Sequence, residues 1–272
     1  MLAIKNNIMA ANAARHLGQS YDALATSVER LSSGLRINSA KDDAAGMAVS
    51  ELMRADVAVS QQGARNAQDG ISMLQTMEGA LSTVDDALVR MKQLAEQAAT
   101  GSYSDAQRAI MNNEFAEMRQ EVDRIATATK FNEITLLDSA SRTVSIQFGN
   151  ATDKIDVLGT NMTSASSGLN TTGLNISSVA GATSALSRLD AAIADKDTAR
   201  ARFGYKMNRL ESTVSVLNIQ SENLLAAKSR ISDVDVATEM ATMTRNQVLA
   251  QAGIAMLTQA NTIPQMALTL LR

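Results

Sequence analysis

Apolar side chains recur along most of this chain at alternating spacings of three and four residues. One run extends from Leu17 to Leu35, and a longer one from Leu74 to Ala98. Further runs cover residues 111–125, 186–224 and 240–257. This heptad spacing is typical of helices that pack along a shared seam. It predicts helices at roughly 4–33, 43–99, 105–128, 180–230 and 234–270.

The middle of the chain carries a different pattern. In TVSIQF, Val144, Ile146 and Phe148 alternate with polar residues, GNATD can form a turn, and KIDVL can return the chain. This period of two predicts a β-hairpin. Residues 160–184 are rich in Ser, Thr, Asn and Gly, and we expect them to form loop and surface.

The expected length of the second helix decides the fold class. Residues 43–99 would span about 85 Å at about 1.5 Å per residue, which exceeds the dimensions of a compact globule of this chain length. We therefore predict a mainly α protein, an elongated antiparallel helical coiled-coil bundle with its N- and C-terminal helices paired and a small β-hairpin region in the middle. The predicted domains are a terminal coiled coil, 1–42 and 233–272, and a helical rod domain, 43–232, that includes the hairpin region at about 131–180.

A polar stretch, LSSGLRINSAKDDAAG at residues 31–46, interrupts the helical pattern. Gly34 can end the first helix in the left-handed conformation, and Asp42 or Asp43 can accept from the free amides of the next helix. Gly101 can end the second helix in the same way. Ser104 and Gln107 then have the spacing of a capping box.

Composition narrows the possible functions. Aromatic residues make up 3% of the chain and Trp is absent, which suits thin helices packed side by side. The absence of Cys excludes disulfides and thiolate chemistry. The net charge of −3 and the scattered basic residues argue against nucleic-acid binding. Residues 246–271 are uncharged but carry several Gln and Asn, so we expect a helix buried in protein and no membrane insertion.

The sequence offers little for catalysis. His16 is the sole histidine and lacks a partner motif for zinc or a catalytic triad, so we expect a surface or seam residue. Adjacent carboxylates on a helix point about 100° apart, so we expect Asp42 and Asp43 to act as caps and Asp85 and Asp86 to be solvated. We expect no enzyme activity, no metal and no cofactor. A methionine stripe that includes Met73 and Met77 could form an adaptable groove, but core packing is favoured because of its seam spacing.

The two ends are the most informative feature. Residues 6–14 and 246–271 carry no charge, and a pair of such helices cannot bury its apolar stripes alone. Head-to-tail binding between copies that does not close into a ring produces an open helical filament. The candidate residues for packing between subunits are Ile4, Ile8, Leu17, Leu24, Val28, Leu31, Met243, Ile254, Leu257, Leu268 and Leu271.

Two long segments resemble the signatures of bacterial flagellins. LSSGLRINSAKDDAAGMAVSELMRADV resembles the N-terminal signature, and SRISDVDVATEMATMTRNQVLAQAGIAMLTQANTIPQMALTLLR the C-terminal one. The resemblance covers nearly all of residues 1–140 and 180–272. It implies a filament subunit outside the cell, with the terminal helices in an inner tube and the longer helices in an outer tube. Only a short middle separates the helices, which resembles a minimal, two-layer form.

The resemblance also implies roles for individual residues. The spoke between the two layers would be formed by Gly34, Arg36, Lys41, Asp42, Asp43 and Gly46. The segment ALVRMKQLAEQAATG resembles the helix that contacts Toll-like receptor 5, with Arg90 and Leu94 as central contacts and Glu114 on the adjacent helix. Val89, Lys92 and Gln93 depart from the residues common there, which leaves receptor activation open.

Further partners follow from the same resemblance. It implies export through the flagellar type III apparatus without a cleaved signal, which agrees with Asn6 and Asn7 breaking any apolar leader. It also implies an export chaperone, a filament cap and hook-junction proteins. Two alternatives stay open at this stage. One is a hook-filament junction protein, and the other is a chemoreceptor-like signalling coiled coil, which would have a helical tip in place of the β-hairpin.

Overall fold

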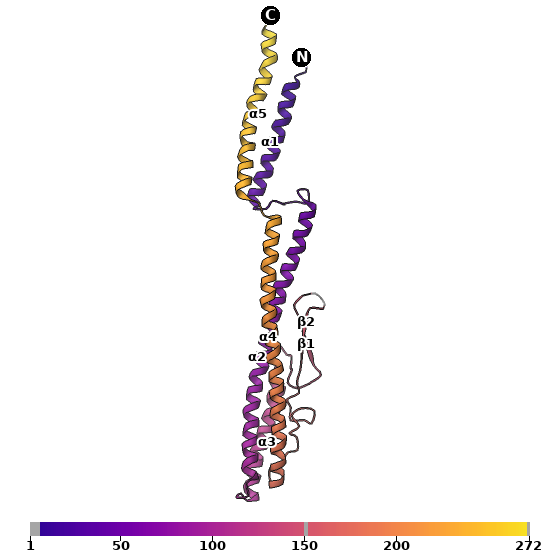
Figure 1. The fold of residues 1–272 in the computed structure, drawn as a ribbon, viewed down its shortest axis with the longest axis vertical. Coiled ribbons are helices and arrows are strands. Elements are labelled where there is room, and N and C mark those ends of the chain that lie inside the picture. Colours follow the sequence, from indigo (N-terminus) through magenta and orange to yellow (C-terminus); the bar gives the residue numbers. More distant parts are fainter. Residues whose placement is uncertain (1–5, 150–151, 271–272) are drawn as a thin grey trace. The chain divides into compact units, whose positions relative to one another are not determined.

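The computed structural model describes residues 6–149 and 152–270, and it describes side chains as far as Ile263. The elements in this part of the chain are α1 (Ile8–Ser33), α2 (Ala44–Ala99), α3 (Asp105–Ala128), β1 (Thr143–Gln147), β2 (Lys154–Leu158), α4 (Val179–Ser232) and α5 (Val236–Leu270) (Figure 1). The predicted helices and hairpin agree with these bounds to within a few residues. A mainly helical fold with a small β-hairpin is therefore confirmed.

The chain divides into two compact units. The terminal unit contains residues 1–57 and 222–272, and the central unit contains residues 58–221. Both α2 and α4 contribute residues to each unit. The predicted domain boundaries lie instead at the polar stretch, at residues 42 and 233, and they stay a prediction.

Local hydrogen bonds define where the helices begin and end. The Asn7 side chain accepts from the Ala10 amide at 3.1 Å and caps α1. Gly34 ends α1 with φ at 72°, a conformation that glycine adopts without steric cost, and its amide donates to the Arg30 carbonyl. Ser104 and Gln107 form the capping box of α3. The predicted roles of Gly34 and Ser104 are therefore confirmed, whereas Gly101 does not have the positive φ expected of it at the end of α2, so that expectation was wrong.

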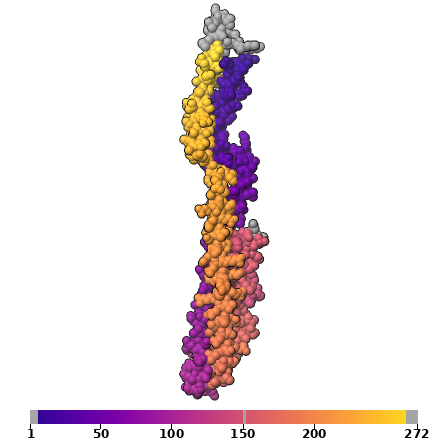
Figure 2. All heavy atoms as spheres, in the orientation of Figure 1, coloured from indigo at the N-terminus to yellow at the C-terminus, as the bar shows by residue number. Residues whose placement is uncertain are grey.

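In the terminal unit, α1 and α5 pack side by side and antiparallel (Figures 1 and 2). The Asn7 amide group donates to the Ala260 carbonyl at 2.8 Å, near the start of α1 and the later part of α5. Arg30 and Glu239 approach to 3.8 Å at the opposite ends of these helices. The pairing of the terminal helices is therefore confirmed.

The seam between α1 and α5 combines small residues with half-buried larger ones such as Leu17, Leu24 and Leu257. Ser27 is 2% exposed, and Ala250 and Ala260 are also buried. The heptad run from Leu17 to Leu35 also places Tyr21 and Val28 on this seam, but they are 48% and 50% exposed, so that expectation was wrong. Small side chains leave space for larger ones from the facing helix, as at Gly253, where an added Cβ would lie 3.1 Å from the Leu17 Cδ1.

The central unit buries large side chains in a continuous core. Its fully buried residues include Leu74, Met77, Leu81, Leu88, Met91, Phe115 and Phe203. The methionine stripe thus packs in the core, as the favoured interpretation expected. Side chains at these positions fill the space between α2, α3 and α4, and the unit closes its own hydrophobic interior.

Ion pairs border this core between α2 and α4. The α2 members Glu78, Asp85 and Lys92 are spaced seven residues apart, and they pair with Arg200, Lys196 and Asp190, respectively. The ammonium of Lys196 lies 2.5 Å from Asp85 and 2.7 Å from Asp197, with the side chain 3% exposed. Asp85 was expected to be solvated, and this was wrong because a buried lysine requires a carboxylate partner.

The β-hairpin packs against α2 within the central unit. β1 and β2 are antiparallel, with Val144 opposite Val157 and Ile146 opposite Ile155. A Cβ at Gly63 would lie 2.2 Å from the Phe148 carbonyl oxygen, so the glycine permits this close approach. The following segment was expected to be loop and surface. It is irregular as far as α4, but Met162, Leu169 and Ile176 are buried in the core.

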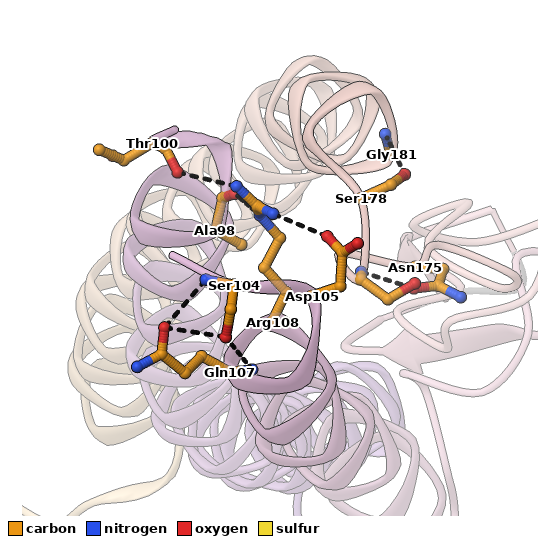
Figure 3. A network of polar contacts seen from close by, with 10 residues as sticks. Ala98, Thr100, Ser104, Asp105, Gln107, Arg108, Asn175, Ser178 and Gly181 are labelled. Atoms are coloured by element: carbon orange, nitrogen blue, oxygen red, sulfur yellow. Dashed lines mark hydrogen bonds and ion pairs between the residues drawn. The ribbon is translucent and has the colours of Figure 1, made fainter. Parts of the chain in front are cut away.

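A buried arginine joins α2 to α3 (Figure 3). The Arg108 Nε donates to the Ala98 carbonyl at 2.9 Å, and its Nη2 donates to the Thr100 carbonyl at 3.1 Å. Its Nη1 pairs with Asp105 at 2.9 Å. Arg108 therefore satisfies carbonyls that the end of α2 would otherwise leave unpaired. No motif in the sequence points to Arg108.

Candidate assembly surface

The terminal helix pair presents its large apolar side chains to solvent. On α1 and α5 these exposed residues are Ile8, Met9, Val28, Val236, Met240, Val248, Leu249, Ile254 and Met256. We call this set the apolar outer face. These side chains lie outside the seam between α1 and α5 and are exposed in the subunit.

Two open grooves mark this part of the terminal unit. One lies along α5 and is lined by Met240, Ala241, Thr244, Arg245, Val248 and Leu249. The other lies between α1 and α5, and its lining includes His16, Leu17, Ser20, Asn246 and Gly253. His16 is therefore an exposed residue of a helix-pair groove, in agreement with the surface or seam position expected for it.

The candidate packing residues fall into three groups. Half-buried at the helix pair are Leu17, Leu24, Leu31, Met243 and Leu257. Exposed on the apolar outer face are Ile8, Val28 and Ile254. Outside the described residues or side chains are Ile4, Leu268 and Leu271. Their role in packing between subunits stays a prediction.

Hydrogen bonds join the polar stretch between α1 and α2 to the segment between α4 and α5. The Arg36 amide donates to the Ser232 carbonyl at 2.7 Å, and its guanidinium donates to the Ile231 carbonyl at 2.7 Å. The Val234 amide donates to the Gly34 carbonyl at 3.1 Å. These backbone contacts hold the two connections of the terminal unit together, and the sequence alone did not reveal them.

The two aspartates of this stretch have different partners. Asp42 accepts from the Asn38 and Ser39 amides and from the Ser39 hydroxyl, and the Ser39 amide is the main cause of the lowered pKa of Asp42. Asp43 caps α2 by accepting from the Gly46 amide at 2.9 Å. Lys41 is exposed. Of the two cap candidates, Asp43 is therefore the one that serves α2.

Gly46 was expected to help the chain turn, and this was wrong. The glycine lies within the first turn of α2 and is not among the residues with positive φ. The chain changes direction before it, between Gly34 and Asp43. The part of these residues in linking two filament layers stays a prediction.

The candidate receptor residues differ in their exposure to solvent. Arg90 on α2 forms an exposed ion pair with Glu114 on α3 at 2.6 Å. Leu94 lies in the central core and is 1% exposed. The structure thus places Leu94 beneath the surface that carries Arg90 and Glu114. An open groove beside them is lined by Val89, Lys92, Gln93, Glu96, Gln97 and Thr100.

Within residues 6–149 and 152–270, no cluster of acidic or histidine side chains is placed to hold a metal ion. In the same part of the chain, no helix is long and apolar enough to cross a membrane. The pronounced feature is the apolar outer face on paired terminal helices. Exposed apolar side chains that gather on one pair of helices are typical of surfaces that bind other proteins, so the fold defines a helical protein with a candidate interaction surface.

Comparison with known proteins identifies the family. The bacterial flagellin N-terminal helical region matches residues 4–142, and the C-terminal helical region matches residues 186–271. The flagellin of Halalkalibacterium halodurans is 42% identical over 270 residues, which cover 99% of each chain. The flagellar filament 33 kDa core protein of Treponema phagedenis is 40% identical over 284 residues, with 99% of each chain covered. The chain belongs to the bacterial flagellin family and is a structural subunit of the flagellar filament.

A solved structure supports the fold independently. A proposed flagellar hook-associated protein of Vibrio parahaemolyticus has a TM-score of 0.60 and 16% identity, with 71% of this chain and 100% of that chain covered. At this identity the likeness shows the fold alone. The curated relatives are a flagellin and a filament core protein, and they match over nearly their whole length. They therefore support a filament subunit and not a junction protein or a signalling coiled coil.

Proposed function

We propose that this flagellin polymerises through the apolar outer face of α1 and α5. The observation that carries the proposal is the exposure of large apolar side chains, such as Met9 and Ile254, on the paired helices α1 and α5. In an isolated subunit these large side chains contact water. Contact with neighbouring copies removes them from water, at about 25 cal/mol for each Å² of apolar surface buried.

The test is seeded elongation of the purified full-length chain. Ile254→Asp places a charge on the apolar outer face, where the side chain is exposed in the subunit and becomes buried on assembly. We expect unchanged helical content by circular dichroism but loss of elongation on preformed filament seeds, because a buried unpaired carboxylate is strongly unfavourable.

A matched control is Ser102→Asp, which places the same charge at an exposed polar position between α2 and α3. We expect this variant to elongate like the unaltered chain. Normal filaments from Ile254→Asp, with the subunit folded, would show that the apolar outer face is not an assembly contact.

We also propose that the subunit is exported unfolded through the flagellar type III apparatus without cleavage. Before export an export chaperone holds its C-terminal segment, and the filament cap and hook-junction proteins then position it. Membership of the flagellin family supports this route, and a structural role of this kind requires no catalytic centre. The mass of the exported chain should equal that of the full sequence, and a chain shortened at its N-terminus would contradict the proposal.

A second proposed role is contact with Toll-like receptor 5 through the surface that carries Arg90 and Glu114. Their exposed ion pair and the adjoining groove favour it. In a receptor reporter assay on subunits, we expect Arg90→Ala to weaken activation by at least about tenfold, since arginines are common binding hot spots. Arg54→Ala is the control, because Arg54 forms its ion pair with Glu51 in the terminal unit. Equal responses from both variants would contradict this role.

A further inference from the structure

Two sets of the described methionines have opposite surroundings. In the central unit, Met73, Met77, Met91 and Met162 are no more than 3% exposed. In the terminal unit, Met9, Met240 and Met256 are 64%, 46% and 62% exposed. All three lie on α1 or α5, within the apolar outer face. We call these three residues the exposed methionine set.

We propose that the exposed methionine set is a site of oxidative modification by hydroperoxides that controls whether a subunit can assemble. The thioether sulfur attacks one peroxide oxygen, so that an S–O bond forms as the O–O bond breaks. The sulfur loses two electrons and becomes a sulfoxide, and the other peroxide oxygen leaves with the proton as water from hydrogen peroxide or as an alcohol from an organic hydroperoxide. Exposure directs this reaction, because a buried thioether is not accessible to the oxidant.

The consequence for assembly rests on the function proposed above. A sulfoxide is polar and accepts hydrogen bonds, whereas the assembly contact buries the outer face against another subunit. In water the new oxygen is hydrated, so the isolated subunit should keep its fold. In the assembled state that hydration is lost, and an acceptor without a donor disfavours the contact.

The three positions are not equivalent. Met9 lies in the uncharged segment 6–14 and Met256 in the uncharged segment 246–271, so neither segment supplies a charged donor. Met240 lines a groove together with Thr244 and Arg245, whose side chains are able to donate to a sulfoxide oxygen. We therefore expect oxidation of Met9 and Met256 to disfavour assembly more than oxidation of Met240.

The experiment uses the full-length chain as subunits and as filaments. Subunits are treated with hydrogen peroxide, the peroxide is removed with catalase, and sulfoxides are located by peptide mass mapping. Elongation on seeds is then followed by light scattering. We expect oxidation first at the exposed methionine set, unchanged helical content, and elongation slowed by about tenfold or more.

Two matched variants test whether the effect of peroxide on elongation depends on the exposed methionines of the terminal unit. Met9→Leu/Met256→Leu keeps apolar side chains of similar volume and should retain most of its elongation rate after peroxide. Met111→Leu/Met118→Leu changes two half-buried methionines of the central unit, and it should remain as sensitive as the unaltered chain. Methionine sulfoxide reductase should restore elongation of the treated unaltered chain, which tests the proposal without any substitution.

Three results would overturn the proposal. They are normal elongation by subunits that carry sulfoxide at Met9 and Met256, equal sensitivity of Met9→Leu/Met256→Leu, and equal oxidation rates of these positions in filaments and in subunits. Failure of untreated subunits to elongate seeds would instead overturn the proposed function, and the methionine proposal with it. The untreated arm thus distinguishes the two failures.

Discussion

The terminal and central units are built from the same residue types but arrange them in opposite ways. The central unit places Leu81, Met77 and Phe115 inside and surrounds them with ion pairs such as Lys196–Asp85. The terminal unit places Ser27 and Ala250 inside and leaves larger apolar residues outside. The central unit therefore completes its own core. Among the described side chains of the terminal unit, many large apolar residues stay exposed, and under the proposed assembly they become buried only when another subunit covers them.

The largest expected effect follows from removing a side chain of the central core. Phe115→Ala should lower the free energy of unfolding by about 3–5 kcal/mol, because it removes buried apolar surface and leaves a cavity. The measurement is denaturant unfolding of the subunit followed by circular dichroism. Ile254→Ala is the companion change in the terminal unit, and its effect on the subunit should stay within about 0.5 kcal/mol. Similar losses from both variants would remove the contrast between the units.

A change within the seam of the terminal unit sharpens the comparison. Ser27→Leu should destabilise the helix pair by about 1–3 kcal/mol, since the larger side chain prevents the close approach of α1 and α5. Hydrogen exchange should become faster in these two helices and stay unchanged in the central unit. Val28→Leu, at the next position but exposed, is the control and should leave exchange unaltered. If it had the same effect as Ser27→Leu, the seam would be assigned to the wrong face.

Changes of pH should have the smallest effects on stability. The terminal unit should respond to acidic pH and the central unit to alkaline pH. The pKa of Asp42 is lowered from its usual value of 3.8, chiefly by the hydrogen bond from the Ser39 amide. Its contribution to the polar stretch is therefore present above about pH 3.8 and is lost as the pH falls through the folded-state pKa. Hydrogen exchange of residues 38–42 at several acidic pH values should show this loss. In the Asp42→Ala variant this change of hydrogen exchange at acidic pH should be absent. If the variant had the same pH profile as the unaltered chain, Asp42 would not be the group responsible.

The alkaline side tests the central unit. Burial disfavours the charged form of Lys196, but hydrogen bonds to Asp197 and Asp85 outweigh it, so the pKa of Lys196 is raised above its usual 10.5. The contribution of the ammonium is fully present below about pH 10.5 and is lost as the pH rises through the folded-state pKa. Thermal unfolding of Lys196→Met should therefore show a weaker alkaline dependence than the unaltered chain. If the variant and the unaltered chain lost stability equally at alkaline pH, a group other than Lys196 would be responsible for that loss.

Much of the fold could be predicted because it depends on local chemistry. The heptad spacing places α2 and α3, the alternation of Val144 and Ile146 with polar residues places β1, and Gly34 and Ser104 end or begin helices by contacts within a few residues. Periodicity also predicted the pairing of the terminal helices. In each case the interacting groups are close in sequence or repeat along it, so the pattern itself carries the information.

The candidate site could be predicted only in outline. That the ends are uncharged, apolar and suited to assembly follows from the sequence. Which side chains face the partner helix does not, because apolarity alone favoured Val28 while the packed structure buries Ser27. The sequence likewise did not predict the burial of Leu94 or the contacts of Arg36 with Ile231 and Ser232, because these depend on segments that are far apart in sequence.

The sequence by itself determined the helices, the hairpin, the caps and the flagellin family of this chain. Tertiary structure alone decided that Ser27 and not Val28 lies in the seam, because helix propensity and hydrophobic spacing do not fix how the two helices are rotated against each other. It also decided that Lys196 would be buried and that Arg108 would satisfy the end of α2. A charged side chain is buried only where partners converge on it, and that convergence exists only once the helices are packed.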